Sequence, residues 1–278
     1  MSGIYAFTGS IPCRDIIIDG INRLYTKGNE LCGTAVNTED KISLFKIHGS
    51  PKTLLEMAES INNEGCTGLA ECANACRAKP SAITSVPCAS EKLAVAVNGN
   101  VENFDELRRR LKVSFPVATD EDLLLALLSF AEGNGFLQKL KYTAELLTGA
   151  PSVVFITSEE NAVYCRAGEY PLAVGIYENG CAVASEMSAL ENGAKRYFIL
   201  EKGESARITK ERCAVYDEKL KRIKKPLLPF PEIKSFENDF GINEEIFCLP
   251  LAVKDTLSKL IKDNRLLLGS FAPSRRGG

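Results

Sequence analysis

The architecture is indicated most clearly by the stretch LAVAVNGNVEN at residues 93–103. Its first five residues are all apolar, which predicts a buried strand. This strand runs directly into Asn98-Gly99, a dipeptide typical of tight turns. The sequence therefore predicts a buried strand that ends in a turn carrying a polar amide side chain.

Helices are predicted on the C-terminal side of this turn. Asn103 and Thr119 are each followed three residues later by an acidic side chain, which is the pattern of a capping box at a helix start. We expect the first of these helices to reach Leu111 and the second to cover the apolar run 123–130. A third helix is expected at residues 136–147.

Strand-like segments lie on both sides of these helices. Upstream, apolar residues at helical spacing also predict helices at residues 15–25 and 51–61. The remaining expected strands are at residues 3–8, 33–36, 42–47, 152–157, 161–166, 172–177, 181–185, 197–200, 205–209 and 213–216. Strands followed by helices and then by strands predict an α+β layered domain over residues 1–217.

The sequence changes character after Asp217. A basic stretch at residues 219–225 and three closely spaced prolines predict an extended linker. Apolar side chains at helical spacing predict a helix at residues 249–268, and the polar end predicts a disordered tail at residues 273–278. We therefore expect residues 218–278 to form a linker, a helix and a tail.

The overall composition excludes several classes of function. Lys and Arg total 34 and Asp and Glu total 36, so the formal net charge is −2 and no positive excess is present for a nucleic acid. No apolar run approaches the roughly 18 residues of a membrane span. The first residues lack the basic segment of a secretory signal. We expect a cytoplasmic protein with no nucleic-acid or membrane partner.

The chain has one histidine and ten cysteines. His48 ends an alternating stretch, residues 42–48, and is expected to be an outward-facing residue of a strand. A single histidine excludes metal sites built on several histidines. Any catalytic base is therefore expected to be a group other than imidazole, and no metal or other cofactor is predicted.

Several motifs occur in an order and spacing that resemble the class II glutamine amidotransferases, most closely the glutaminase half of glucosamine-6-phosphate synthases. The motifs are MSGI at residues 1–4, RLYTKG at 23–28, CGTAV at 32–36, NGNVEN at 98–103, TD at 119–120, LTGA at 147–150 and ASE at 184–186. The resemblance covers about residues 1–257.

The resemblance implies a fold and a set of roles. The fold would be the four-layer αββα sandwich of the N-terminal nucleophile hydrolases, in which the first residue of the mature chain supplies both the nucleophile and its free α-amine as the base. Asn98 and the Gly99 backbone N–H would form the oxyanion hole. Asp120 would hold the α-ammonium of a glutamine substrate.

Two departures from the family pattern affect the predicted chemistry. Ser2 stands where the family has its catalytic cysteine, and we expect removal of Met1 to leave Ser2 first. A hydroxyl is far less ionised than a thiol with a pKa of about 8.5. Ala73 stands where the family has the arginine that grips the substrate α-carboxylate, and Glu71 adds a negative charge nearby. Arg77 is the remaining candidate for the α-carboxylate.

These departures predict a degenerate glutaminase, whose hydrolysis of glutamine is impaired or lost and whose ligand, if it is active, is a glutamine-like small molecule. The chain ends soon after the segment that resembles the family's connection to its isomerase half. We therefore expect it not to make glucosamine 6-phosphate alone.

A metal site is one alternative function, because Cys66, Cys72, Cys76 and Cys88 lie close together in the sequence. Their spacing lacks the Cys-x2-Cys pair of most zinc or iron–sulfur sites. Ordinary buried thiols are the simpler interpretation.

Two further alternatives keep the fold. The domain could be a non-enzymatic partner or regulatory module of an intact synthase, or form a homodimer, with the apolar face of residues 249–268 as the docking surface. That helix could equally fold back on its own domain. Alternatively, Ser2 could act as an N-terminal serine amidohydrolase on another amide, with Asn98 and Gly99 as its oxyanion hole.

Overall fold

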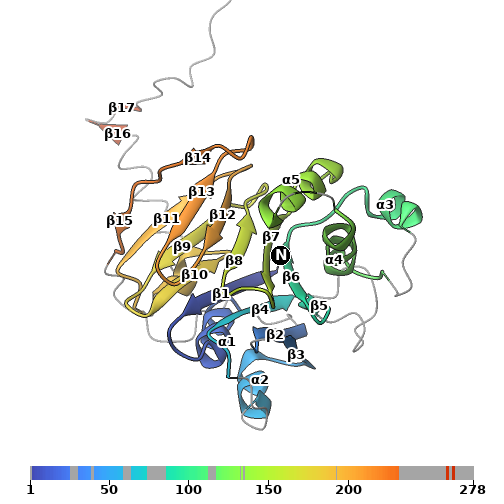
Figure 1. The fold of residues 1–278 in the computed structure, drawn as a ribbon. Coiled ribbons are helices and arrows are strands. Elements are labelled where there is room, and N and C mark those ends of the chain that lie inside the picture. Colours follow the sequence, from blue (N-terminus) through green and yellow to red (C-terminus); the bar gives the residue numbers. More distant parts are fainter. Residues whose placement is uncertain are drawn as a thin grey trace, which may run out of the picture. The chain divides into compact units, whose positions relative to one another are not determined.

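The computed structural model describes residues 2–25, 31–38, 41–58, 64–73, 86–111, 117–131, 133, 135–191, 193–231, 261–262 and 265–266. The chain divides into two compact units, Met1–Pro231 and Glu232–Gly278. The first unit holds two antiparallel β-sheets and the helices that pack on them (Figure 1).

The first sheet carries the N-terminal strand near its centre. Within the described residues it has eight strands, and β1 lies between β10 and β4. In spatial order the strands are β15 (Leu228–Pro229), β11 (Arg196–Leu200), β9 (Leu172–Ile176), β10 (Gly180–Ala184), β1 (Gly3–Gly9), β4 (Thr67–Ala73), β2 (Leu31–Asn37) and β3 (Ile42–His48).

The second sheet carries the strand that leads into the Asn98-Gly99 turn. It has seven strands within the described residues. Their spatial order is β14 (Arg222–Ile223), β13 (Cys213–Tyr216), β12 (Ser205–Ile208), β8 (Val163–Arg166), β7 (Ser152–Thr157), β6 (Leu93–Asn98) and β5 (Cys88–Ala89).

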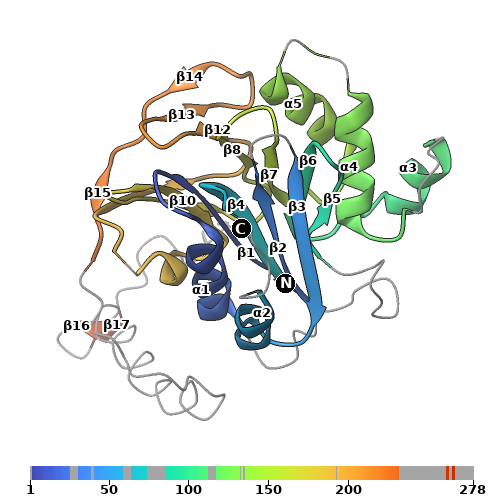
Figure 2. The same cartoon turned by 60° about the horizontal axis from the view of Figure 1, so that its bottom comes forward.

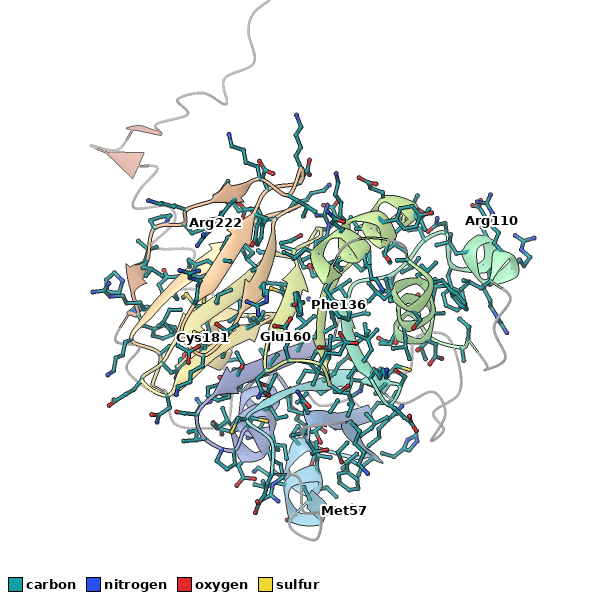
Figure 3. All side chains as sticks on the ribbon, in the orientation of Figure 1. Met57, Arg110, Phe136, Glu160, Cys181 and Arg222 are labelled. Atoms are coloured by element: carbon teal, nitrogen blue, oxygen red, sulfur yellow. The ribbon has the colours of Figure 1, made fainter. Side chains whose placement is uncertain are left out.

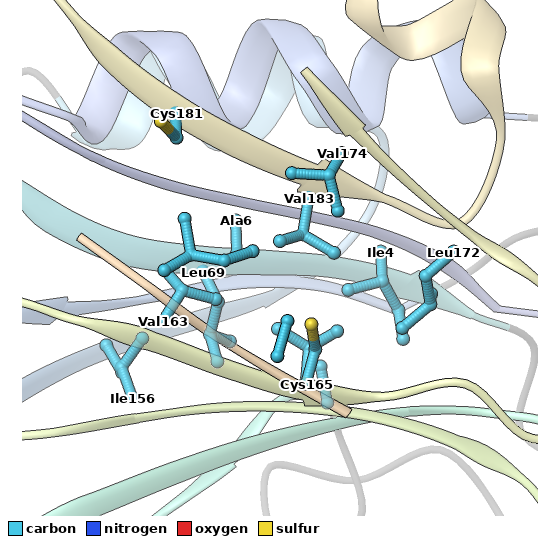
Figure 4. Close-up of a cluster of buried hydrophobic side chains, with 14 of the residues drawn as sticks. Ile4, Ala6, Leu69, Ile156, Val163, Cys165, Leu172, Val174, Cys181 and Val183 are labelled. Carbon is cyan, nitrogen blue, oxygen red and sulfur yellow. The ribbon is translucent and has the colours of Figure 1, made fainter. Parts of the chain in front are cut away.

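Successive side chains along a central strand point to opposite faces of its sheet, and both faces are covered by a core. In β1, Ile4 and Ala6 belong to the core between the sheets, whereas Tyr5 and Phe7 belong to the core beneath α1 (Arg14–Leu24). Figure 4 shows part of the core between the sheets. Central strands are therefore continuous apolar runs, as the sequence predicted for residues 93–97.

Helices cover the outer faces of both sheets (Figure 2). Helix α1 and α2 (Pro51–Ala58) lie on the first sheet, and α4 (Asp120–Phe130) and α5 (Phe136–Leu146) lie on the second. Helix α3 (Phe104–Arg110) packs against α4, and the short 3-10 helix η1 (Met187–Leu190) joins the core beneath α1. The predicted four-layer αββα sandwich is confirmed.

The two capping predictions had different outcomes. At α4, the Thr119 hydroxyl accepts a hydrogen bond from the backbone N–H of Asp122 at 3.1 Å, and the Asp122 carboxylate accepts one from the backbone N–H of Thr119, so the capping box is confirmed. At α3, the prediction is wrong. The Asn103 side chain instead donates to the carbonyl of Leu146 at 2.8 Å and accepts from the backbone N–H of Thr148 at 3.0 Å, which joins the start of α3 to the end of α5.

The segment after Asp217 is extended, and it adds an edge strand to each sheet. Strand β14 pairs with β13, and β15 pairs with β11. In the second unit, β16 (Ile261–Lys262) pairs with β17 (Arg265–Leu266). The prediction of a helix at residues 249–268 is therefore wrong at these four residues. In the sequence an Asp-Asn pair, which favours a turn, separates the two strands. The rest of that segment and the tail lie outside the described residues.

No helix among the described residues is long and apolar enough to cross a membrane.

The packing of α1 on β1 makes one glycine sensitive to substitution. A Cβ on Gly20 would overlap the Tyr5 ring, so Gly20→Ala should lower the free energy of unfolding by about 1–3 kcal/mol. The usual effect of this change inside a helix has the opposite sign. Urea denaturation checks the prediction, with Asn22→Ala on the exposed face of α1 as the matched control. A Gly20→Ala protein as stable as wild type would contradict it.

Candidate functional site

The start of β1 and the end of β6 lie close together at the same end of the two sheets. The backbone nitrogen of Ser2 donates to the side-chain oxygen Oδ1 of Asn98 at 3.3 Å. Ser2 lies two residues before Ile4, and Asn98 two residues after Ala96, both of which face the core between the sheets. The period of two along a strand therefore directs both polar side chains towards the space between the layers.

Hydrogen bonds between strands hold Ser2 in place. The backbone N–H of Ile4 donates to the Ser185 hydroxyl at 3.2 Å, and the Ser185 N–H donates to the Ile4 carbonyl at 3.0 Å. Strand β1 is thereby paired on both sides up to its first residues, because β4 pairs with its other edge. The position of Ser2 follows from this pairing.

Gly99 makes the turn after Asn98 possible. Its φ is +116°, a conformation that residues with a Cβ rarely adopt. A Cβ there would also lie 3.2 Å from the Cα of Pro151. The chain then reaches Val101, whose backbone N–H donates to Oδ2 of Asp120 at 3.3 Å. Asp120 is the first residue of α4 and is buried, so the turn and the helix start are fixed together.

The structure therefore brings four of the five predicted site residues into one region: Ser2, Asn98, Gly99 and Asp120. Arg77 lies outside the described residues. The catalytic and substrate-binding roles of all five remain predictions.

Glu71 adds a fully buried carboxyl group to this region. It lies on β4 directly opposite Ile4 of β1. Its Oε1 accepts a hydrogen bond from the backbone N–H of Val97 at 3.4 Å, and the carboxyl group also accepts one from the Ser2 side chain. Among the described residues, Oε2 has no hydrogen-bond partner.

Burial raises the pKa of Glu71 well above its usual value, because the charged form loses its solvation, and the nearby Glu121 carboxyl acts in the same direction. The hydrogen bonds from Val97 and Ser2 and the charge of Lys46 oppose this rise in pKa but do not cancel it. The protonated form of Glu71 is therefore favoured more than in an exposed glutamate.

Ala73, two residues further along β4, leaves only a methyl group at its position. It packs against Leu31 and Val86 and is buried. Because Gly3 pairs with Cys72, the residue that follows Cys72 lies across from Ser2. The side chain that lies across from Ser2 on β4 is thus the apolar methyl group of Ala73.

Sequence reasoning did not identify Glu121. Burial raises its pKa to about 7, and the neighbouring carboxylates of Asp120 and Asp122 add to the effect, while hydrogen bonds at the start of α4 oppose it. The acidic run at residues 120–122 was visible, but it indicated a helix start. The charge interaction between Glu121 and Glu71 links α4 to β4, which lie in different layers. A local sequence pattern does not predict an interaction between layers.

The cysteines proposed as a metal site lie apart. Cys72 packs beneath α1 on the first sheet, whereas Cys88 packs against the helices on the second. The Cys88 thiol donates to Oδ1 of Asp122 at 2.9 Å, and burial raises its pKa. Among the described residues, no three His, Cys, Asp or Glu side chains form a group that could hold a metal ion. Cys76 lies outside these residues.

The candidate site contains the hydroxyl group of Ser2, the side-chain amide of Asn98 and the buried carboxyl group of Glu71. All three lie at one end of the sandwich. These groups can hydrogen-bond a small polar ligand. A hydroxyl beside an amide donor and a carboxyl group is also a possible starting point for attack on a carbonyl group.

One family model and several curated proteins are similar to this chain. A family model described as "Glutamine amidotransferase domain" matches residues 82–192. The chain is 28% identical over 290 residues to the glutamine--fructose-6-phosphate aminotransferase [isomerizing] of Haemophilus ducreyi, covering 99% of this chain and 47% of that protein. It is 27% identical to the corresponding protein of Clostridium perfringens, covering 95% and 45%. The chain spans about half the length of the curated relatives that it matches.

Two solved structures share the fold. The glutamine phosphoribosylpyrophosphate amidotransferase of B. subtilis, in complex with ADP and GMP, aligns with a TM-score of 0.67 and 20% identity over 79% of this chain and 50% of that one. A structure described as the allosteric regulatory enzyme of purine biosynthesis aligns with a TM-score of 0.69 and 21% identity over 78% and 49%.

Burial of Glu121 should make stability depend on pH. Its pKa is about 7 in the folded protein and that of an ordinary glutamate when unfolded, so the folded state holds the extra proton and stability is lost as pH rises towards and past 7. Glu121→Gln should remove a loss on the order of 3 kcal/mol between pH 5 and pH 8.

Urea denaturation across that pH range measures the difference. Glu106→Gln, at an exposed position of α3, is the matched control and should keep the wild-type pH dependence. If Glu121→Gln and wild type lose stability in parallel, Glu121 is not the group responsible.

Proposed function

Because this chain carries a class II glutamine amidotransferase domain related to glucosamine-6-phosphate synthase, we propose that the domain is a degenerate glutaminase, which retains a site for an amide ligand but hydrolyses glutamine weakly or not at all. The observation that carries this proposal is that Ser2 hydrogen-bonds the buried carboxyl group of Glu71 and lies across from Ala73 on the adjacent strand.

Ser2 is a poor nucleophile in this environment. A serine hydroxyl must lose its proton to a base as it attacks, whereas a thiol with a pKa of about 8.5 is partly ionised beforehand. The raised pKa of Glu71 favours its protonated form, which cannot take that proton. The other base that the family resemblance offers is the α-amine of a mature Ser2, whose nitrogen lies within hydrogen-bond distance of Asn98.

The family resemblance suggests two positions for a partner of the substrate's α-carboxylate. Ala73 occupies the position of the family's arginine and is an apolar buried residue. The other candidate, Arg77, lies outside the described residues. Loss of a charge-assisted contact costs about 1.5–3 kcal/mol of binding.

The amide end of the ligand would keep its partners. By the family resemblance, Asn98 and the Gly99 N–H would hydrogen-bond an amide carbonyl, and Asp120 would hold an ammonium group. A glutamine-like molecule would then be bound without being hydrolysed. This supports a role as a partner or regulatory module of an intact synthase, and we propose a cytoplasmic location for it. A docking or homodimer role for residues 249–268 stays a proposal.

A second candidate function is hydrolysis of a different amide by Ser2. The hydrogen bond between Ser2 and Glu71 favours it, because an ionised Glu71 could accept the Ser2 proton as Oγ attacks the amide carbonyl. The resulting oxyanion would face Asn98 and Gly99. Glu71 would return the proton to the leaving ammonia, and water would then hydrolyse the ester on Ser2. The substrate would carry no α-carboxylate.

A glutaminase assay tests the first candidate. Purified wild-type protein should release glutamate and ammonia from glutamine no faster than the buffer blank, because Ser2 and Ala73 replace the catalytic cysteine and the arginine of the family pattern. Ser2→Cys should give slow turnover. Adding Ala73→Arg to that variant should increase kcat/KM roughly 10- to 100-fold if the guanidinium restores the contact.

Two controls make this assay decisive. Mass spectrometry of each protein establishes whether Met1 has been removed, and thermal unfolding establishes that Ala73→Arg is folded. Wild-type turnover at or above about 1 s⁻¹, an ordinary enzymatic rate, would refute the degenerate-glutaminase proposal.

Covalent labelling tests the second candidate. An electrophilic mimic of a primary amide that lacks a carboxylate should modify Ser2, and the rate should rise with pH as Glu71 ionises. Glu71→Gln should slow labelling about tenfold or more and remove the pH dependence. Ser10→Ala, at an exposed serine, should label like wild type. Absence of label on Ser2 in a protein with a free Ser2 amine would exclude the serine amidohydrolase and leave the first candidate standing.

A further inference from the structure

Two cysteines from different sheets meet at one end of the sandwich. Cys181 is the second residue of β10 in the first sheet, and Cys213 is the first residue of β13 in the second. Their Sγ atoms are 3.7 Å apart, although the residues are 32 positions apart in the sequence. Both side chains border the core between the sheets, and Figure 4 shows Cys181 with that core.

Two hairpin turns bring these thiols together. The turn that precedes β10 ends at Gly180, and the turn that precedes β13 is closed by Thr209 and Arg212, whose backbone groups are hydrogen-bonded. The Cys181 thiol also lies 3.8 Å from the carbonyl of Lys210 in the second turn. The contact is thus part of the way the two hairpins pack.

The two thiols differ in exposure and in acidity. Cys181, labelled in Figure 3, is 3% exposed, whereas Cys213 is partly exposed beside its turn, so the pair borders solvent on the Cys213 side. The Cys213 S–H donates to the sulfur of Cys181. This hydrogen bond lowers the pKa of Cys181 and, with burial, raises that of Cys213. Cys181 is therefore the more acidic thiol of the pair.

Cys32, Cys72 and Cys165 lack this combination. Cys32 and Cys72 lie directly opposite each other on β2 and β4, but both are fully buried beneath α1. Cys165 is fully buried in the core between the sheets. Burial raises the pKa of Cys32 and of Cys165 to about 12, so neither is a ready nucleophile.

We propose that Cys181 and Cys213 form a peroxide-reactive dithiol, an oxidation site that closes to a disulfide bond linking the two sheets. A low-pKa thiolate next to a second, resolving thiol is the arrangement that reversible cysteine oxidation requires. The oxidant is hydrogen peroxide or a small organic hydroperoxide, because a bulky disulfide would not reach Cys181.

The reaction balances in two steps. The Cys181 thiolate attacks one peroxide oxygen, the O–O bond breaks, and the products are Cys181 sulfenic acid and hydroxide, which takes up a proton to become water. The Cys213 sulfur then attacks the Cys181 sulfur, forms the S–S bond and displaces the sulfenic oxygen, which leaves as water with the thiol proton. The two thiols lose two electrons in total, and the peroxide gains them.

The bond would act at a distance from Ser2. Cys181 pairs with Thr8 near the end of β1, whereas Ser2 precedes the start of that strand. Closing the bond brings the sulfurs from 3.7 Å to about 2.05 Å. The bond would join the two sheets at the end opposite the candidate site. The inference does not depend on the proposed function.

Mass spectrometry of the full chain tests it. After reduction and desalting, stoichiometric hydrogen peroxide should lower the intact mass by that of two hydrogen atoms. A non-reducing digest should contain one peptide pair that joins Cys181 to Cys213. The oxidised protein should also unfold at a higher temperature than the reduced one, because the bond restricts the unfolded chain. Dithiothreitol should reverse both changes.

Variants decide which thiols react. Cys213→Ser and Cys181→Ser should each abolish the crosslink and the rise in Tm, while Cys32→Ser, in the buried pair, should keep both. Cys213→Ser should also accumulate sulfenic acid at Cys181, detectable with a dimedone probe. Peroxide that adds oxygen elsewhere without joining Cys181 to Cys213, or a crosslink that persists in Cys213→Ser, would overturn the proposal.

Discussion

Burial of the facing sides of the two sheets is the constraint on which the rest of this domain depends. The side chains that meet between the sheets are mostly small or β-branched, such as Ala6, Ala96 and Val154, and they are fully buried. Small side chains let the layers pack closely and exclude water. Polar groups at the ends of the same strands therefore lose solvent as well. The raised pKa of Glu71 follows from the packing that stabilises the fold.

Much of the sandwich could be predicted because each central strand is apolar on both faces. Residues 93–97 form β6 as expected, and Asn98-Gly99 forms the turn after it. The capping box at Thr119 was also predictable, since all its partners lie within one helical turn. Asn103 has the same local pattern, but its partners, Leu146 and Thr148, are more than forty residues away in the sequence. At Asn103 these tertiary hydrogen bonds form in place of the capping hydrogen bonds that the local pattern predicts.

The candidate site was predictable to the extent that motifs record it. Family motifs pointed to Ser2, Asn98, Gly99 and Asp120, and the structure brings these residues together. Glu121 was not predictable, because its importance lies in a carboxyl group on another layer, Glu71. At residues 261–262 and 265–266 the error was of another kind. The apolar spacing favoured a helix, whereas the backbone pairs as two short strands. Periodicity describes one element at a time and gives no contact between elements.

The protonation state of Glu71 connects the two candidate functions. While it is protonated, the carboxyl group can donate a hydrogen bond to a ligand but cannot accept the Ser2 proton. Once ionised, it can serve as a base, yet it then repels a substrate carboxylate. Binding of a glutamine-like acid and hydrolysis by Ser2 therefore favour opposite states of one group. Under the proposed function, a site of this composition would select against hydrolysis of an α-amino acid amide and would remain compatible with hydrolysis of an amide without a carboxylate.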